Sequence, residues 1–169
     1  GVCRGVVCGP VGTAGVAYRR GGDADECRVD MDTWRWSGPA AAFYSAMDFL
    51  GTHDTPRVLT LLGTDRRGES KADRAEDRLR PWERGRAAAE LRLASLVLFT
   101  FPGSPMVYYG DEAGMEGFED PLNRGTYPWG HEDRDLLAWF SRLGALRNGY
   151  PVLQTGALRW LCTAGPLLA

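Results

Sequence analysis

The chain has 169 residues, of which 44% are hydrophobic and 25% are charged, with a formal net charge of -2. This composition is typical of one soluble globular domain, and the small net charge argues against nucleic acid as a partner. No apolar run is long enough to cross a bilayer, and residues 1–15 lack the pattern of a signal peptide, so we expect a cytoplasmic protein with no membrane partner.

The cysteines show no metal-binding pattern, because they lack CxxC spacing and a matching Cys/His pair. They are Cys3, Cys8, Cys27 and Cys162. A chain of this size does not need disulfides to fold, so we expect free thiols.

Residues 1–38 are expected to be poorly organised. The glycine density of residues 1–22 weakens helices and strands, and residues 23–38 show no convincing amphipathic pattern. All basic residues except Lys71 are arginines, which indicates a gene rich in G and C. Such a gene also yields small residues and arginine in a wrong frame, so a frameshifted segment is a second hypothesis for residues 1–38.

Order is expected to begin near Pro39. Residues 42–51 (AFYSAMDFLG) have the length and aromatic content of a buried strand. Thr55, followed by Pro56, can be the N-cap of a short helix that ends at Leu62.

The middle of the chain predicts a solvated connection and then a long helix. Charges of both signs alternate over residues 65–86, which is typical of a solvated loop and helix start. A helix is predicted over residues 83–100, because four apolar residues recur at helical spacing. These residues are Ala87, Leu91, Ala94 and Leu98.

A second strand, residues 106–109 (MVYY), is predicted from its short, wholly apolar sequence, with both tyrosines in the core. A long loop follows, and then an amphipathic helix over residues 133–148. Its inward residues are expected to be Leu136, Leu137, Phe140, Leu143 and Leu146. His131 is expected to be exposed, and residues 157–162 to be the first strand of a further unit.

This alternation of strands and helices predicts an α/β fold with parallel strands and right-handed crossovers. Two such units do not close a (β/α)8 barrel, which takes roughly 250 residues. The expected fold is therefore part of a larger barrel.

In parallel α/β folds, reactive groups lie where strands end. His53 and Asp54 follow the first predicted strand, with Arg57 one turn later. An arginine near a carboxylate favours its charged form, which glycoside hydrolysis requires. The spacing alone slightly favours another interpretation, in which these three residues cap and tether the short helix.

Two further candidates follow the second predicted strand. Asp111 and Glu112 are expected to belong to a solvated turn. Asp120 and Arg124, four residues apart in the next loop, can both bond sugar hydroxyls or can pair with each other. Trp129 is a candidate for stacking against a sugar.

The segment DFLGTHDTPR (residues 48–57) resembles the fourth signature region of the α-amylase family, glycoside hydrolase family 13, at the end of the seventh barrel strand. Residues 101–117 (FPGSPMVYYGDEAGMEG) resemble its eighth strand and the loop after it, and residues 120–129 (DPLNRGTYPW) are similar to its active-face loop. Residues 136–156 resemble the eighth helix and the approach to the C-terminal β domain. THDTPR and DPLNR are most similar to the cyclomaltodextrinase, neopullulanase and maltogenic amylase branch.

The resemblance implies a domain division and a role for each candidate residue. Residues 39–150 would be the C-terminal part of a (β/α)8 TIM barrel, and residues 151–169 would start a C-terminal β domain. Asp54 would be the third catalytic carboxylate, and His53 would bond the sugar being cleaved. Arg57 would support both from behind, while Asp120 and Arg124 would hold a more distant glucose unit.

The resemblance also implies retaining hydrolysis of α-glucosidic linkages, with maltooligosaccharides, cyclodextrins or pullulan-like α-glucans as substrates. That mechanism requires an aspartate nucleophile and a glutamate acid/base. Nothing in residues 1–37 matches either, so this chain alone is expected to be inactive. No cofactor is expected, while calcium and a homodimer stay open for the intact enzyme. The alternatives are a non-catalytic amylase-like scaffold that binds glucan or a protein, and a remnant without function.

Overall fold

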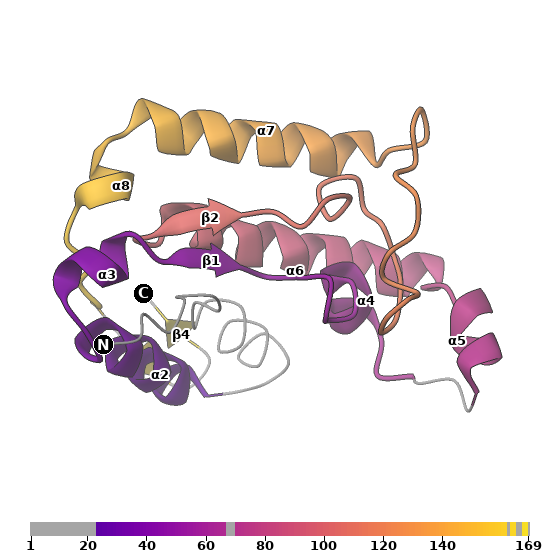
Figure 1. Ribbon diagram of the computed structural model, residues 1–169, viewed down its shortest axis with the longest axis horizontal. Coiled ribbons are helices and arrows are strands. Elements are labelled where there is room, and N and C mark those ends of the chain that lie inside the picture. The colour runs from indigo at the N-terminus through magenta and orange to yellow at the C-terminus, as the bar shows by residue number, and fades with distance from the viewer. Residues whose placement is uncertain (1–22, 67–69, 162, 165–166, 169) are drawn as a thin grey trace.

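The computed structural model describes residues 23–66, 70–161, 163–164 and 167–168. Two short parallel strands lie at its centre, with helices on both sides (Figure 1). None of the described helices is long and apolar enough to span a membrane.

The expectation of poor organisation is wrong for residues 24–36, which form helix α2 (Ala24–Trp36). The carboxylate of Asp23 accepts hydrogen bonds from two backbone amides of the first turn, which is a strong N-cap. One face of the helix is buried, through Ala24, Cys27 and Met31. The helix was missed because this apolar face is narrow. Residues 1–22 lie outside the described residues.

Cys27 is a free, buried thiol, and its burial raises its pKa. The other three cysteines lie outside the described side chains.

The predicted strand at residues 42–51 is shorter than expected. Its first part is helix α3 (Ala40–Tyr44), because three alanines after Pro39 favour a helix. Strand β1 (Met47–Phe49) follows and is buried at its last two residues.

The second strand is β2 (Ser104–Met106), which begins two residues before the predicted segment MVYY and leaves the two tyrosines in the loop. It pairs with β1 in parallel, with Met47 opposite Ser104 and Phe49 opposite Met106. The predicted parallel pairing is confirmed.

Helices α4 (Val58–Gly63), α5 (Lys71–Glu76) and α6 (Pro81–Thr100) lie between the two strands in the chain. The predicted long helix is confirmed by α6, and its four predicted apolar residues are all buried. Helix α6 packs against α4, α7 and β2, so that it joins the parts of the core.

Helix α7 (Arg134–Gly149) confirms the last predicted helix, and the short helix α8 (Val152–Thr155) follows it. Leu136, Phe140 and Leu143 are buried as expected, whereas Leu137 is exposed. Residues 157–161 form no strand, contrary to expectation. The antiparallel strands β3 (Thr163–Ala164) and β4 (Leu167–Leu168) come slightly later.

Candidate functional site

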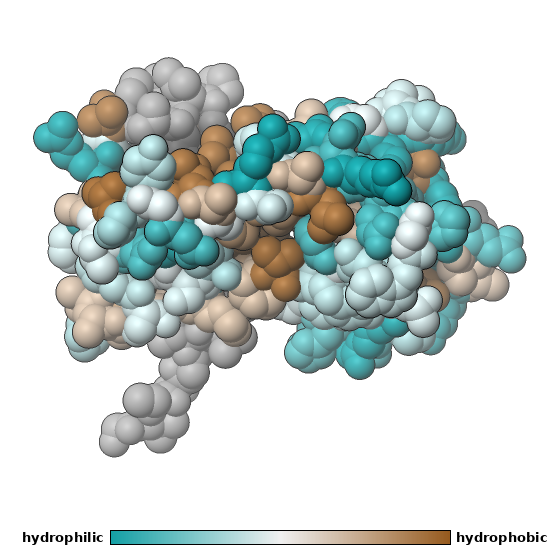
Figure 2. Space-filling model, turned by 90° about the horizontal axis from the view of Figure 1, so that it is seen from above, coloured by the Kyte–Doolittle hydropathy of each residue, from teal (hydrophilic) through white to brown (hydrophobic). Residues whose placement is uncertain are grey.

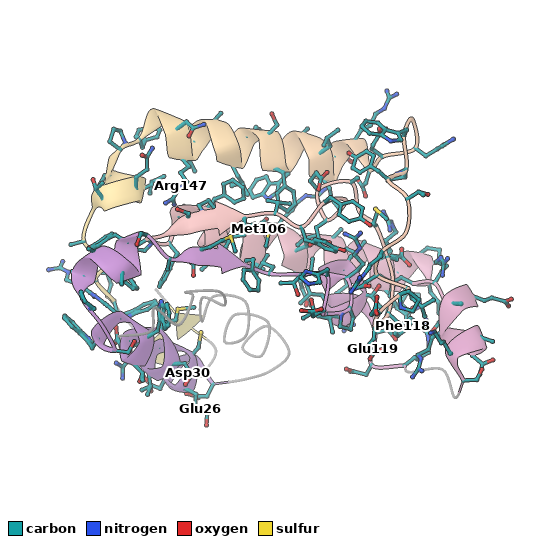
Figure 3. All side chains as sticks on the ribbon, in the orientation of Figure 1. Glu26, Asp30, Met106, Phe118, Glu119 and Arg147 are labelled. Carbon is teal, nitrogen blue, oxygen red and sulfur yellow. The ribbon has the colours of Figure 1, made fainter. Side chains whose placement is uncertain are left out.

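The loops that follow β1 and β2 lie at the same end of the molecule, because the two strands run in the same direction (Figure 1). This end is mostly hydrophilic in the view from above, on the right of Figure 2. Two hydrogen bonds fix the second loop to the first loop and to α4. The Arg57 amide donates to the carbonyl of Gly117 (2.9 Å), and the Gly117 amide donates to the hydroxyl of Thr60 on α4 (2.9 Å). Phe118 and Glu119 accordingly lie beside α4 (Figure 3).

A tight turn presents His53 and Asp54 to solvent. The Thr52 amide donates to Thr55 Oγ1 (3.0 Å), and the Asp54 amide donates to Thr52 Oγ1 (3.1 Å). Thr55 therefore closes this turn and is not the predicted N-cap; α4 begins after Arg57, without a side-chain cap. The side chains of His53 and Asp54 are 65% and 74% exposed, and His53 Nε2 lies 3.4 Å from Asp54 Oδ1.

Arg57 does not pair with Asp54, contrary to the sequence interpretation. Its buried guanidinium lies 3.2 Å from the carboxylate of Asp111 and donates to the carbonyl of Tyr109. It also lies over the rings of Tyr108 and Tyr109, 4.4 Å and 4.6 Å from their centroids. Arg57 thus joins the turn after β1 to the loop after β2 through buried contacts beneath the exposed residues.

Asp111 does not lie in a solvated turn, because its carboxylate is buried against Arg57. Burial raises the pKa of Asp111 to about 7, and the Arg57 charge opposes this shift. A Cβ on Gly51 would lie 2.8 Å from Asp111 Oδ2, so glycine permits this close approach. Sequence spacing could not reveal the pair, because its members are 54 residues apart.

The loop at residues 120–124 supplies the arginine that does approach Asp54. Arg124 Nη2 lies 3.9 Å from Asp54 Oδ1, and Arg124 Nε lies 2.8 Å from Asp120 Oδ1. Of the two interpretations of Asp120 and Arg124, the structure shows their mutual ion pair. Four candidate residues, His53, Asp54, Asp120 and Arg124, therefore lie together on an exposed surface.

Asn123 was missed by the sequence interpretation, although it fixes the turn that carries His53 and Asp54. Its buried amide donates to the carbonyls of His53 (2.8 Å) and Thr55 (2.7 Å). The loop residue beside Arg124 thereby positions the turn that carries Asp54. An asparagine within a Pro- and Gly-containing loop was the only available signal.

Aromatic side chains that are exposed or half-buried lie in the loop after β2. Trp129 is 80% exposed, and its ring contacts that of Tyr127 at a tilt of 51°, with a centroid distance of 4.6 Å. Tyr109 is exposed, contrary to its predicted place in the core, and its hydroxyl donates to the carbonyl of Gly125 (2.8 Å). Tyr108 is half-buried, and His131 is exposed as expected.

A second buried aspartate and arginine, Asp48 and Arg147, lie between α7 and the strands. Arg147 Nη1 donates to the carbonyls of Phe99 and Phe101 (both 2.9 Å), and Arg147 points from α7 toward β2 (Figure 3). Burial raises the pKa of Asp48, on β1, to about 7, and Arg147 opposes this shift. This pair was also missed and lies away from the exposed surface. Among the described residues, no group of three or more His, Cys, Asp and Glu could hold a metal ion.

The family profile described as "Alpha amylase, catalytic domain" matches residues 24–150. An amylopullulanase from Thermoanaerobacter thermohydrosulfuricus is 42% identical over 131 residues, which are 78% of this chain and 8% of that protein. A cyclomaltodextrinase from Geobacillus thermopakistaniensis (strain MAS1) is 35% identical over 127 residues, 74% of this chain and 18% of that protein.

The structure is similar to that of a debranching enzyme from Nostoc punctiforme, with a TM-score of 0.78 and 24% identity. The match covers 97% of this chain and 33% of that one, and it supports a fold related to TIM barrels. The chain spans less than a fifth of the length of the amylopullulanase and of the cyclomaltodextrinase. The profile match begins at residue 24, so the similarity includes α2, which the sequence resemblance did not cover.

Proposed function

The chain belongs to the family of alpha-amylase catalytic domains, and from this premise we propose that it is part of a retaining hydrolase of α-glucosidic linkages. The observation that carries the proposal is the exposed group of His53, Asp54, Asp120 and Arg124 at the carboxyl ends of two parallel strands. In parallel α/β folds, this is where substrates bind.

In the proposed enzyme, β1 and β2 are the seventh and eighth strands of a (β/α)8 barrel, and β3 and β4 start a C-terminal β domain. Asp54 helps to stabilise the positively charged sugar of the transition state, since its exposed carboxylate has a histidine and an arginine as neighbours. His53 bonds the sugar that is cleaved. Asp120 and Arg124 exchange their mutual ion pair for hydroxyls of a neighbouring glucose unit.

Arg57 has a supporting role in this proposal. It is buried and bonded to Asp111, so it acts on substrate through the turn that holds His53 and Asp54. The aspartate nucleophile and glutamate acid/base come from strands outside the matched motifs. The proposed reaction uses carboxylates alone and takes no cofactor.

We expect this chain by itself to bind an α-glucan weakly but not to hydrolyse it, because no sequence motif in it matches the nucleophile or the acid/base. Incubation of the pure chain with maltooligosaccharides, cyclodextrin and pullulan should release no reducing ends. Measurable turnover by the pure chain would contradict this expectation.

Binding tests the site itself. Titration with maltoheptaose should shift the NMR signals of the His53 ring, and Arg124→Ala should weaken binding. Arg28→Ala is the matched control, since Arg28 also pairs with two aspartates on the surface, but on α2. Saturating maltoheptaose without any shift at His53 would refute the proposed site.

The upstream nucleotides distinguish an enzyme from a scaffold. Translation in all frames should supply the missing strands with their aspartate and glutamate. Upstream strands that lack both carboxylates would favour the non-catalytic scaffold.

A further inference from the structure

The carboxylate of Asp111 approaches both ends of the turn that carries His53 and Asp54. Its Oδ1 lies 3.2 Å from Nη1 of Arg57, which follows the turn. Its Oδ2 lies 2.8 Å from the position that a Cβ on Gly51, which precedes the turn, would occupy. One buried side chain from the loop after β2 therefore faces the chain both before and after the exposed residues.

The loop after β2 holds Asp111 in place through its backbone. The Asp111 amide donates to the carbonyl of Tyr108 (3.1 Å), and the Gly114 amide donates to the carbonyl of Asp111 (3.2 Å). Gly110 has a positive φ of 86°, and its amide donates to the carboxylate of Glu112 (2.8 Å). The Asp111 side chain is only 5% exposed, so a change in its charge acts on the groups around it and is little screened by water.

Two charged groups face the Asp111 carboxylate among the described residues. Arg57, between β1 and α4, has the opposite charge, whereas Glu112, the next residue in the same loop, has the same charge. Gly51 presents only its backbone. Burial raises the pKa of Asp111 to about 7, against the attraction of Arg57. The carboxyl group therefore changes its charge near neutral pH, where an ordinary aspartate is already ionised.

The charge of Asp111 determines how firmly Arg57 is held. Opposite charges attract each other strongly where water is excluded. When Asp111 is neutral, the guanidinium of Arg57 keeps the carbonyl of Tyr109 and the rings of Tyr108 and Tyr109 as contacts, but it loses its counter-charge. The end of the turn is then bound less firmly to the loop after β2.

We infer that Asp111 is a positioning residue of the proposed site, and that its ionised carboxylate holds the turn in the geometry in which His53 and Asp54 bind an α-glucan. Asp111 acts through Gly51 and Arg57 and does not touch the sugar, because it is buried. The inference rests on the proposed function and adds that glucan affinity depends on pH around neutrality. The affinity should rise with pH, since the ionised form attracts Arg57.

The test measures the affinity of the full chain for maltoheptaose by calorimetry from about pH 6 to about pH 8. With a pKa of about 7, the ionised fraction of Asp111 rises from roughly one-tenth to roughly nine-tenths, so the affinity should rise about ninefold. Asp111→Asn cannot ionise and should lose this rise. Any pH dependence that comes from the exposed His53 remains in this variant, so the difference between the two proteins reports Asp111.

Asp48→Asn is the matched control. Asp48 is also buried, and its pKa is likewise raised to about 7 with an arginine opposing the shift. Its carboxylate lies beside Gly103, before β2, whereas Asp111 lies after β2. Asp48→Asn should therefore keep the rise of affinity with pH. If both variants change the affinity alike, Asp111 has only a structural role and the inference is refuted.

NMR of the unmodified chain tests the same contacts without a substitution. The carboxyl carbon of Asp111 and the backbone amides of Gly51 and Arg57 should titrate with one shared midpoint. Amide signals that do not follow the Asp111 carboxyl would refute the inference.

The binding outcomes separate this inference from the proposed function. If the unmodified chain binds no maltoheptaose at any pH in this range, the proposed function fails, and the inference fails with it. If the chain binds maltoheptaose and Asp111→Asn shows the same rise with pH, the inference is refuted and the proposed function stands.

Discussion

Two aspartate–arginine pairs lie within one small region and differ mainly in burial. The side chains of Arg124 and Asp120 are 46% and 55% exposed, with Nε and Oδ1 2.8 Å apart. Those of Arg57 and Asp111 are 0% and 5% exposed, with Nη1 and Oδ1 3.2 Å apart. An exposed pair contributes about 0–1 kcal/mol, so a sugar can replace either partner at little cost. Removal of one partner from a buried pair leaves an uncompensated charge.

An aspartate–arginine pair therefore has one function when it is buried and another when it is exposed. The buried pair joins the loops after β1 and β2, and the exposed pair presents charged groups to a ligand. Variants of the buried pair should lose mainly stability, and variants of the exposed pair should lose mainly binding.

Arg57→Ala should have the largest effect on stability. It leaves the Asp111 carboxylate buried without its partner, and it should lower the free energy of unfolding by about 3–5 kcal/mol. Urea unfolding followed by tryptophan fluorescence measures the loss. A loss no larger than that of Arg124→Ala would contradict the division of functions between the two pairs.

The second buried pair predicts a dependence of stability on pH. An unfolded aspartate ionises near pH 4, whereas Asp48 in the folded chain has a pKa of about 7. Between these values folding takes up a proton, so the free energy of unfolding should fall as the pH rises from about 4 to 7.

Each pKa unit corresponds to about 1.4 kcal/mol, so Asp48 should contribute a decrease of about 2–4 kcal/mol. Asp48→Asn, which has nearly the same shape and no charge, should reduce this slope in urea unfolding at several pH values. Asp120→Asn is the exposed control and should leave the slope unchanged. Equal slopes in all three proteins would rule out Asp48 as the cause.

Asn123→Ala should have an intermediate effect on stability, because it removes the link between the loop after β2 and the turn after β1. Loss of two partly buried hydrogen bonds, to the carbonyls of His53 and Thr55, should cost about 1–3 kcal/mol. It should also release the turn that carries Asp54, so hydrogen exchange at Thr55 should become faster. Unchanged exchange would show that the turn holds its own shape.

Arg124→Ala should have the smallest effect on stability, about 0–1 kcal/mol, since the pair that it breaks is exposed. It should nevertheless weaken maltoheptaose binding more than Arg57→Lys does, because that substitution keeps a positive charge near Asp111. A large loss of stability without a change in binding would reverse the functions assigned to the two pairs.

The sequence interpretation was correct where structure depends on residues close together in the chain, and wrong where it depends on contacts between distant residues. The long helix and its stripe at Ala87, Leu91, Ala94 and Leu98 were predicted because helical spacing is local. Helix α2 was missed because its buried face consists of only three residues. The partner of Arg57 was predicted wrongly, since the nearest carboxylate in sequence is not the nearest in space.

The sequence by itself determined the family, the two-strand order and the residues at the strand ends, because motifs and local periodicity are written in consecutive positions. Only the tertiary structure decided which arginine approaches Asp54, that Asp111 is buried and that Asn123 connects the two loops. These outcomes depend on which segments pack together and how much water they exclude, and neither follows from residue spacing.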